Sequence, residues 1–196
     1  MSGLKNVLKE ARACTLCAAQ FDGHEPRPVL RAGARARLMI IGQAPGTRVQ
    51  ETGIPWNDPS GDRLRQWLEM DKPAFYDEEK IAIVPMGFCY PGRDKHGADL
   101  PPRPECAPKW HPLILDALPH IGLTVLIGGY AQKYYLGSSR KKTMTETVRA
   151  WRDYAPEFIT LPHPSWRNTG WLKKNPWFET DLLPELRQRV GVLLGT

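Results

Sequence analysis

Three short segments combine residue types that could carry out acid–base or binding chemistry. The first is Gly42-Gln43-Ala44-Pro45-Gly46, a turn whose glycines would let the backbone approach a ligand closely. The second surrounds Asp58, which could act as a catalytic carboxylate or simply cap the following helix. The third places His163 between two prolines, which would hold its imidazole rigidly. Each signal is weak alone, because turns, caps and isolated histidines are common structural features.

Four cysteines form a second group of candidate ligands. Cys14 and Cys17 make a Cys-x-x-Cys pair, and Cys89 and Cys106 follow much later in the chain. Four thiolates in an intracellular chain suit a structural zinc ion or an iron–sulfur cluster, and the wide spacing of the second pair favours iron–sulfur. Buried cysteines without a metal are the remaining interpretation.

The basic composition indicates a polyanionic partner. The chain has 27 Lys and Arg residues against 21 Asp and Glu residues, a formal net charge of +6. Cations and aromatic side chains interleave just after His163, which suits phosphate contacts combined with base stacking. The plainer interpretation is a solvated basic face. The residues concerned are Trp166, Arg167, Trp171, Lys173, Lys174 and Trp177.

Length and hydropathy predict one globular domain. With 196 residues, of which 41% are hydrophobic, the chain is long enough to bury a core. No apolar run approaches the roughly 18 residues of a membrane span, and the N-terminus lacks the apolar stretch of a signal peptide. We therefore expect a cytoplasmic protein that does not act at membranes and whose cysteines stay reduced.

Four short apolar runs predict the buried strands of a parallel sheet. Helix-compatible segments separate them, so the class is α/β, a three-layer α/β/α sandwich with a central four-stranded, mainly parallel sheet. Ligands of such folds bind at the carboxyl ends of the strands, where Gly42 and His163 both fall. The expected strands are Leu38–Ile41, Ile81–Val84, Leu123–Ile127 and Phe158–Leu161, and the expected helices are 4–13, 62–70, 104–118, 143–154 and 175–190.

Taken in order, these motifs resemble the uracil-DNA glycosylase superfamily, and within it the iron–sulfur branches called families four and five. Gly42–Gly46 is similar to the first signature loop, His163-Pro164-Ser165 is similar to the second, and the cysteine spacing is similar to that of the cluster ligands. The resemblance runs from Cys14 to about Leu172. It implies a single glycosylase-like domain over 1–196, with an N-terminal helix and Cys-x-x-Cys region (1–36), a catalytic core (37–172) and a C-terminal helix (175–196).

The first motif departs from the family pattern. Family one has a catalytic Asp where this chain has Ala44, and family four has a Glu where this chain has Gln43. Family five resembles the Asp58-x-Ser60-Gly61 pattern, which implies that Asp58 is the catalytic carboxylate. Pro85 replaces the Asn with which family four reads the edge of uracil, so base selection must come from elsewhere. Trp56 takes the place of a stacking Phe.

The resemblance implies a monofunctional glycosylase that flips uracil, or another deaminated base, out of DNA and hydrolyses its N-glycosidic bond in base excision repair. His163 would hydrogen-bond the leaving base, Asp58 would offset the charge of the sugar and orient water, and Gln43 would meet the base or the water. Further contacts are expected to the base from Gly42, Ala44, Pro45, Gly46, Trp56 and Asn57, and to DNA from Ser60, Ser165, Trp166, Arg167 and Asn168.

The resemblance also implies a [4Fe–4S] cluster on Cys14, Cys17, Cys89 and Cys106, with zinc or no metal as alternatives. The expected partner is DNA containing uracil or a related lesion. A monomer is expected, because a one-domain enzyme needs no second chain to build this site. Two other functions stay open: a glycosylase for hypoxanthine or other damaged bases, and a non-catalytic, metal-stabilised DNA-binding module, which the missing first-motif carboxylate would permit.

Overall fold

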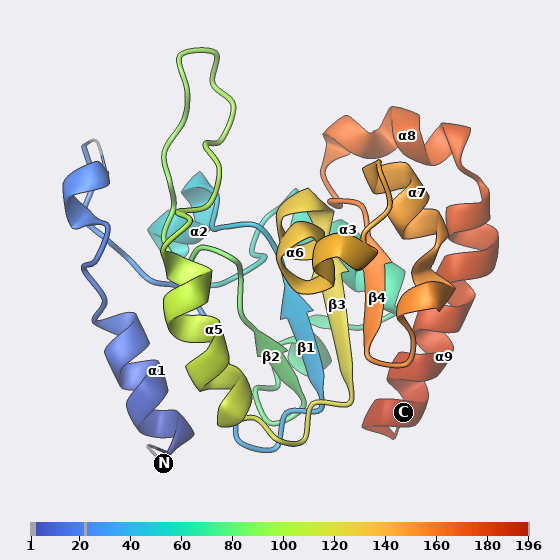
Figure 1. Cartoon of the computed structure of the whole chain (residues 1–196), viewed down its shortest axis with the longest axis horizontal. Coiled ribbons are helices and arrows are strands. Elements are labelled where there is room, and N and C mark those ends of the chain that lie inside the picture. The colour runs from blue at the N-terminus through green and yellow to red at the C-terminus, as the bar shows by residue number, and fades with distance from the viewer. Residues whose placement is uncertain (1–2, 22, 196) are drawn as a thin grey trace.

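A parallel sheet of four strands lies at the centre of the computed structural model, which describes residues 3–21 and 23–195. The strands occur in the order β2-β1-β3-β4, and every neighbouring pair is parallel (Figure 1). The predicted strand positions are confirmed, except that β2 ends one residue earlier than expected. The strands are β1 (Leu38–Ile41), β2 (Ile81–Ile83), β3 (Leu123–Ile127) and β4 (Phe158–Leu161).

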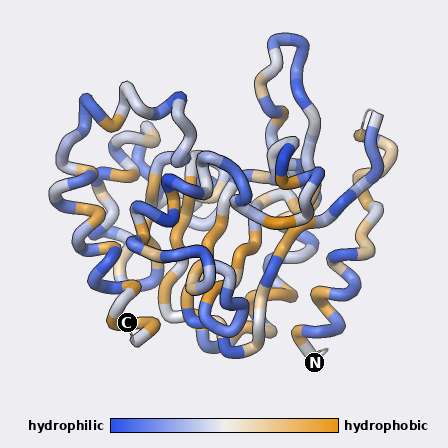
Figure 2. Tube along the Cα trace, turned by 180° about the vertical axis from the view of Figure 1, so that it is seen from behind, coloured by the Kyte–Doolittle hydropathy of each residue, from blue (hydrophilic) through white to orange (hydrophobic). Residues whose placement is uncertain are grey.

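Alternate residues of each strand enter two apolar cores. In β1, Leu38 and Ile40 belong to one core, whereas Met39 and Ile41 belong to the other, because successive side chains point to opposite faces of a sheet. Helices cover both faces of the hydrophobic strands seen in Figure 2, which confirms the three-layer α/β/α class. On the Met39 face they are α1 (Leu4–Arg12), α5 (Cys106–Asp116) and α6 (Gly128–Leu136); on the Leu38 face they are α3 (Pro59–Leu68), α4 (Lys72–Phe75), α7 (Met144–Arg149) and α9 (Leu183–Leu194).

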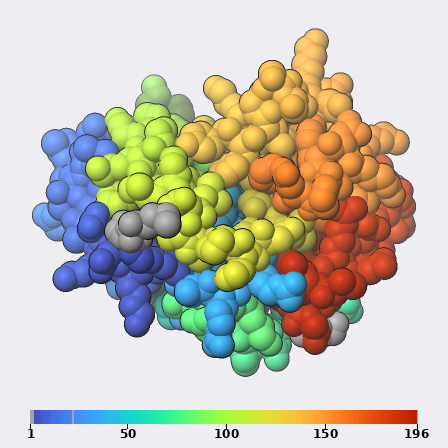
Figure 3. Space-filling model, turned by 60° about the horizontal axis from the view of Figure 1, so that its bottom comes forward, coloured from blue at the N-terminus to red at the C-terminus, as the bar shows by residue number. Residues whose placement is uncertain are grey.

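The order of the strands places an opening at the carboxyl ends of β1 and β3. The chain leaves β1 toward one edge of the sheet to form β2, and then crosses back to form β3 on the other side of β1. Connections that diverge in this way leave the crevice in which α/β proteins bind ligands. This end of the sheet is at the top of Figure 1. Figure 3 turns the opposite end toward the viewer, where the N-terminal segment and α9 flank the middle of the chain.

Several helices start or end away from their predicted positions. α3 begins at Pro59 rather than at residue 62, because the Asp58 side chain caps it. The helix predicted at 143–154 consists of α7, which ends at Arg149, and a separate 3₁₀ turn at Trp151–Tyr154. Within the range predicted as a helix, 175–190, Phe178–Leu182 forms a π-helical turn, and α9 begins only at Leu183 and continues to Leu194.

The sequence patterns missed three helices near the carboxyl end of the sheet. α2 (Thr47–Thr52) and α8 (Thr169–Lys174) have six residues each, too few to show a helical repeat of apolar positions. α6 starts directly at the end of β3, where Gly128 has a φ of +80°, a backbone conformation that suits glycine.

The segment before β1 covers the outer edge of β2. Arg31 and Ile83 exchange two backbone hydrogen bonds, of 3.0 and 2.7 Å, in an antiparallel bridge. An uncovered strand edge would otherwise present unpaired N–H and C=O groups. The segment 18–36 thus closes the sheet on this side, and its described residues contain only a short 3₁₀ turn at Ala18–Gln20.

The helices are short. The longest, α9, has 12 residues, and no helix in the described part of the chain has the length and apolar character needed to cross a membrane.

Candidate active site

A pocket of about 270 Å³ opens at the carboxyl ends of the strands. It is lined by the loop after β1, the segment that leads into α3, the loop after β2 and the segment after β4. Parallel strands end at the same edge of a sheet, so residues that are distant in the chain meet here. Most of the sequence-predicted site residues line this pocket: Gly42, Gln43, Ala44, Pro45, Gly46, Trp56, Asp58, Ser60, His163, Ser165, Trp166 and Arg167.

Backbone hydrogen bonds hold the loop after β1 against the loop after β2. The N–H of Met86 donates to the carbonyl of Gly42, and the N–H of Gly87 donates to the carbonyl of Gln43, both at 2.9 Å. These bonds continue the pairing of β1 and β2 beyond the ends of the strands. Gln43 therefore lines the pocket from a fixed backbone.

Trp56 forms a wall of the pocket in a backbone conformation that is rare for a bulky residue, with a φ of +57°. Two glycines permit its packing: a Cβ on Gly42 would lie 2.7 Å from the indole, and a Cβ on Gly61 would lie 1.7 Å from the Trp56 carbonyl oxygen. Arg65 donates to the same oxygen at 3.2 Å. The ring centroids of Trp56 and His163 are 5.7 Å apart. A strained residue that its surroundings hold in place suits a functional site.

Asp58 combines a structural contact with a position in the pocket. Its Oδ1 accepts a hydrogen bond of 2.8 Å from the N–H of Gly61, which makes Asp58 the N-cap of α3. No other hydrogen bond joins its side chain to the described part of the chain. The capping role and the catalytic role considered from the sequence are therefore compatible, because the capped carboxylate still lines the cavity.

The His163 side chain is partly buried, and its surroundings shift the pKa of its imidazole in opposite directions. Burial, the largest effect, lowers the pKa of its imidazole, and the negative charges of Asp58 and Asp99 raise that pKa. Because burial dominates, the imidazole is neutral near pH 7, with one nitrogen that donates a hydrogen bond and one that accepts. A neutral N–H donor in the lining of a cavity can stabilise negative charge that develops on a leaving group.

Side chains from two elements position the segment after β4. Asn168 donates to the carbonyl of His163 at 2.7 Å, and the Ser165 hydroxyl accepts the N–H of Arg167 at 3.2 Å. Arg63 reaches across from α3 and donates to the carbonyl of Ser165 at 3.0 Å. Asn168, expected as a DNA contact, is thus turned toward the backbone of His163. Neither it nor Asn57, expected as a base contact, is among the described residues that line the pocket.

Trp166 and Arg167 follow at the mouth of the pocket. Trp166 is 73% exposed, and the guanidinium of Arg167 lies 5.9 Å from the centroid of its indole. An exposed aromatic ring paired with a cation beside a cavity suits base stacking and phosphate binding.

Two charged residues of the pocket were not identified from the sequence. Arg93 and Asp99 lie on the loop between Cys89 and Cys106, and both line the pocket. The segment is rich in proline and glycine, a composition typical of a long loop. A polar loop contains no apolar repeat that would tell which of its side chains turn inward.

The four cysteines line a second, mostly apolar cavity bounded by the turn after α1, the loop after β2 and the start of α5. The backbone N–H of Phe88 donates to Cys106 Sγ at 3.4 Å, and the backbone of Arg27 hydrogen-bonds Cys89. Burial, followed by the charges of the other cysteines, raises the pKa of Cys89 to about 11 and that of Cys106 to about 12. Such thiols lose their protons when a metal cation binds them.

The donor set of the cysteine cavity consists of four thiols. Within residues 3–21 and 23–195, no three His, Cys, Asp or Glu side chains are grouped so as to hold one metal ion. In a [4Fe–4S] cluster each thiolate binds a different iron, so the sulfurs surround a larger group. Four partly buried thiols around one cavity, with N–H donors to sulfur, suit that arrangement.

Comparison with known proteins identifies the class. The family model described as the uracil DNA glycosylase superfamily matches residues 31–187. Because this match spans most of the chain, the protein belongs to the uracil DNA glycosylase superfamily. Membership supports a DNA glycosylase, a hydrolase whose substrate is DNA.

One similar solved structure is the solution NMR structure of a candidate uracil DNA glycosylase from Methanosarcina acetivorans. The two chains share 12% identity at a TM-score of 0.48, and the match covers 83% of this chain and 98% of the other.

Proposed function

We propose that this protein is a monofunctional DNA glycosylase that releases uracil, or another deaminated base, from DNA in base excision repair. The observation that carries the proposal is the single pocket in which the loop after β1, Trp56, Asp58 and His163 meet. The net charge of +6 and the exposed Trp166–Arg167 pair beside the pocket suit a DNA partner.

The target nucleotide must leave the base stack, because the bond between base and sugar is inaccessible within a duplex. Trp56 offers the extruded base a rigid aromatic face. Trp166, which is exposed, would occupy the vacated position in the stack, and Arg167 would bind a flanking phosphate.

Cleavage of the bond leaves negative charge on the base and positive charge on the sugar. The N–H of His163 would donate to a carbonyl oxygen of the departing base. Asp58 would offset the positive charge at C1′ and orient the attacking water. The Gln43 carboxamide, which can both donate and accept, would bind the base edge or the water. Pro85 has no side-chain hydrogen-bonding group, so it cannot read the base edge.

We further propose that Cys14, Cys17, Cys89 and Cys106 bind a [4Fe–4S] cluster, as in the iron–sulfur branches. When bound, the cluster would cross-link three segments of the chain, and it would transfer no electrons in the reaction, since hydrolysis of an N-glycosidic bond is not a redox step. Iron and sulfide analysis of anaerobically purified protein, with absorbance at about 400 nm, tests this. A colourless protein free of iron would contradict it.

Base release from a labelled oligonucleotide that contains uracil tests the function. With enzyme in excess, His163→Ala and Asp58→Asn should each slow release by about 100-fold or more. Asp71→Asn is the matched control for Asp58→Asn, because Asp71 caps α4 in the same way, through the N–H of Ala74 at 2.8 Å, and does not line the pocket. His120→Ala controls for loss of an imidazole that does not line the pocket.

The same assay with other bases determines the substrate range. Oligonucleotides that contain hypoxanthine, xanthine or thymine opposite guanine should be compared with uracil at equal enzyme concentration. Release of none of these bases by the wild-type protein would refute the glycosylase proposal, and DNA binding without release would then favour a non-catalytic module.

A further inference from the structure

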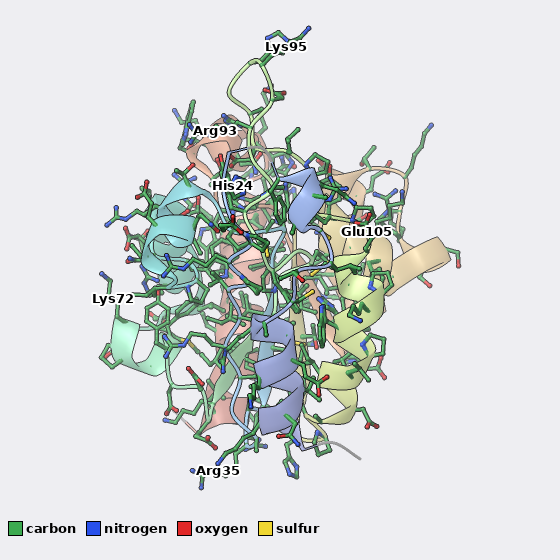
Figure 4. All side chains as sticks on the ribbon, turned by 90° about the vertical axis from the view of Figure 1, so that its left-hand side faces the viewer. His24, Arg35, Lys72, Arg93, Lys95 and Glu105 are labelled. Carbon is green, nitrogen blue, oxygen red and sulfur yellow. The ribbon has the colours of Figure 1, made fainter. Side chains whose placement is uncertain are left out.

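A β-hairpin stands beside the pocket, between the third and fourth cysteines. Residues 92–100 form it: the N–H of Leu100 donates to the carbonyl of Gly92 at 2.9 Å, and Arg93 and Asp99 face each other in an antiparallel bridge. It is the green loop that rises from the top of the molecule in Figure 1. Figure 4 shows Lys95 at its tip, with Arg93 nearer its base.

The turn of the hairpin is well defined by its own hydrogen bonds. The carboxylate of Asp94 accepts the N–H groups of His96 and Ala98, at 2.8 and 2.9 Å. Gly97 has a φ of +77°, which suits glycine in a tight turn. The paired strands and the closed turn give the side chains of Arg93 and Asp99 definite directions.

Asp99 brings a second carboxylate to the pocket that contains His163 and Asp58. It also lines a groove that continues from the pocket between the hairpin and the segment after β4, where Gln43 and Arg167 form other parts of the wall. The negative charge of Asp99, like that of Asp58, raises the pKa of His163 against the effect of burial. Asp99 therefore faces the same imidazole as Asp58 from a different segment of the chain.

The two carboxylates are held in different ways. Asp58 caps α3, so it cannot move without disturbing the start of that helix. Asp99 is half exposed, and its Oδ1 lies 3.5 Å from the Nε of Arg93, which is also half exposed. An exposed ion pair of this kind contributes little stability, so a competing anion can replace Asp99 at the guanidinium.

We propose that Asp99 is a second catalytic carboxylate, which binds the attacking water and accepts its proton. Arg93 holds Asp99 in an ion pair until a DNA phosphate replaces Asp99 at the guanidinium. This inference rests on the proposed glycosylase function. Asp58 then has the electrostatic part, to offset the positive charge of the sugar. This division of roles suits the two carboxylates, because Asp58 is fixed by the start of α3, whereas a bound DNA strand can release Asp99 from Arg93.

The step balances as a hydrolysis. The water oxygen forms a bond to C1′ while the bond from C1′ to the base breaks, and the bonding electrons leave with the base. One proton of the water passes to Asp99 and from there to solvent, and the base anion takes a proton from solvent. No oxidant, reductant or further reactant is consumed.

Arg93 and Arg167 both line the pocket, Arg93 on the hairpin and Arg167 on the segment after β4. A strand that presents a flipped nucleotide to the pocket would bring a phosphate to each guanidinium. DNA binding and the release of Asp99 would then be the same event, which keeps the carboxylate paired until substrate is present.

Single-turnover base release and DNA affinity, measured on the same variants, test the proposal. Asp99→Asn should slow release of uracil by roughly 10- to 100-fold, while its affinity for an oligonucleotide with uncleavable 2′-fluorodeoxyuridine stays equal or improves. Arg93→Gln should weaken binding of the oligonucleotide and lower the salt slope by about 1. Asp153→Asn is the matched control, because Asp153 is also half exposed and pairs with Lys141 at 2.7 Å, and neither residue lines the pocket.

A charge-swapped variant, Arg93→Asp with Asp99→Arg, separates catalysis from hairpin structure. It can keep the ion pair across the same bridge. If Asp99 only stabilises the hairpin, the swap should restore the rate, and the proposal fails. If Asp99 is catalytic, the swap should be as slow as Asp99→Asn, and added formate should recover part of the rate of Asp99→Ala, because a small carboxylate can enter the groove.

The outcomes distinguish this inference from the proposed function. If the wild-type protein releases the base and Asp99→Asn releases it at a rate within threefold of the wild-type rate, the role of Asp99 is refuted and the glycosylase function stands. No release by the wild type from any of the tested bases refutes both.

Discussion

The candidate active-site pocket and the cysteine cavity differ in what holds their residues in place. The pocket is held by hydrogen bonds within the chain, from Asn168 to His163, from Arg63 to Ser165, and between the loops after β1 and β2. The cysteine cavity contains thiols whose burial and mutual charges raise their pKa values. Under the proposal of a bound cluster, the thiols would lose their protons to become ligands. The fold preorganises the pocket, whereas the cysteine cavity would then depend on the group that it binds.

The two regions share one stretch of chain. Between Pro85 and Cys106, the backbone passes from the pocket to the cysteine cavity at Cys89, returns to the pocket at Arg93 and Asp99, and reaches the cavity again. His111 adds a second link, because it extends from α5 and donates through Nε2 to the carbonyl of Pro85 at 3.0 Å. Loss of the proposed cluster would therefore affect the pocket through this stretch.

The largest expected effects distinguish the two regions. Cys106→Ser should remove the bound iron and lower the melting temperature by roughly 10 °C or more, since metal-binding free energy contributes directly to folding. His163→Ala should abolish most base release and leave both iron content and melting temperature near the wild-type values. Iron analysis, thermal unfolding and the release assay on the same two preparations check this. Full activity in iron-free Cys106→Ser would show that the pocket does not depend on the cavity.

A smaller effect tests how rigidly the pocket is built. Gly61→Ala places a Cβ against the backbone oxygen of Trp56, so α3 or Trp56 must move, and we expect a loss of about 3 kcal/mol in the free energy of unfolding. Gly129→Ala is the control, because a Cβ there meets nothing within 4 Å and the residue lies in the first turn of α6. Urea unfolding of both proteins provides the measurement. Equal stability of the two variants would mean that the wall at Trp56 adapts easily.

The link between the regions should be sensitive to pH. Burial lowers the pKa of His111 to about 4, below its unfolded value of about 6.5, so the stability it contributes is present above pH 6.5 and is lost as the pH falls toward 4. His111→Gln should be less stable by about 1–3 kcal/mol at pH 7, because it loses the bonds to Pro85 and Tyr135, and this deficit should shrink in acid. Unfolding curves at several pH values measure the difference. A deficit that stays constant with pH would argue against a neutral, buried imidazole.

The smallest effect concerns the mouth of the pocket. Arg167→Gln should weaken binding to DNA without changing stability, and it should reduce the slope of log affinity against log salt by about 0.9 for a duplex. Arg35→Gln is the control, because Arg35 is 81% exposed and lies at the other end of the molecule from Lys95 (Figure 4). Fluorescence anisotropy at several salt concentrations would show the change. Equal slopes for both variants would place the DNA elsewhere.

Much of the scaffold could be predicted because its signals are local. Runs such as Leu123–Ile127 are apolar throughout, since strands of a parallel sheet are buried on both faces. The loops at Gly42 and His163 then follow strand ends and must meet at one edge of the sheet. Helix boundaries were less accurate, because a cap such as Asp58 starts α3 before its apolar pattern begins.

The sequence by itself determined the α/β class, the strands, the set of four cysteines and the two motif loops, because apolar runs and motif spacing are properties of neighbouring residues. Only the tertiary structure decided that Arg93 and Asp99 fold back over the pocket, that Asn168 turns toward the backbone of His163, and that Trp56 adopts a positive φ. These features depend on contacts between distant segments. No local pattern specifies them, because polar loop residues take their directions from the surfaces against which the loop packs.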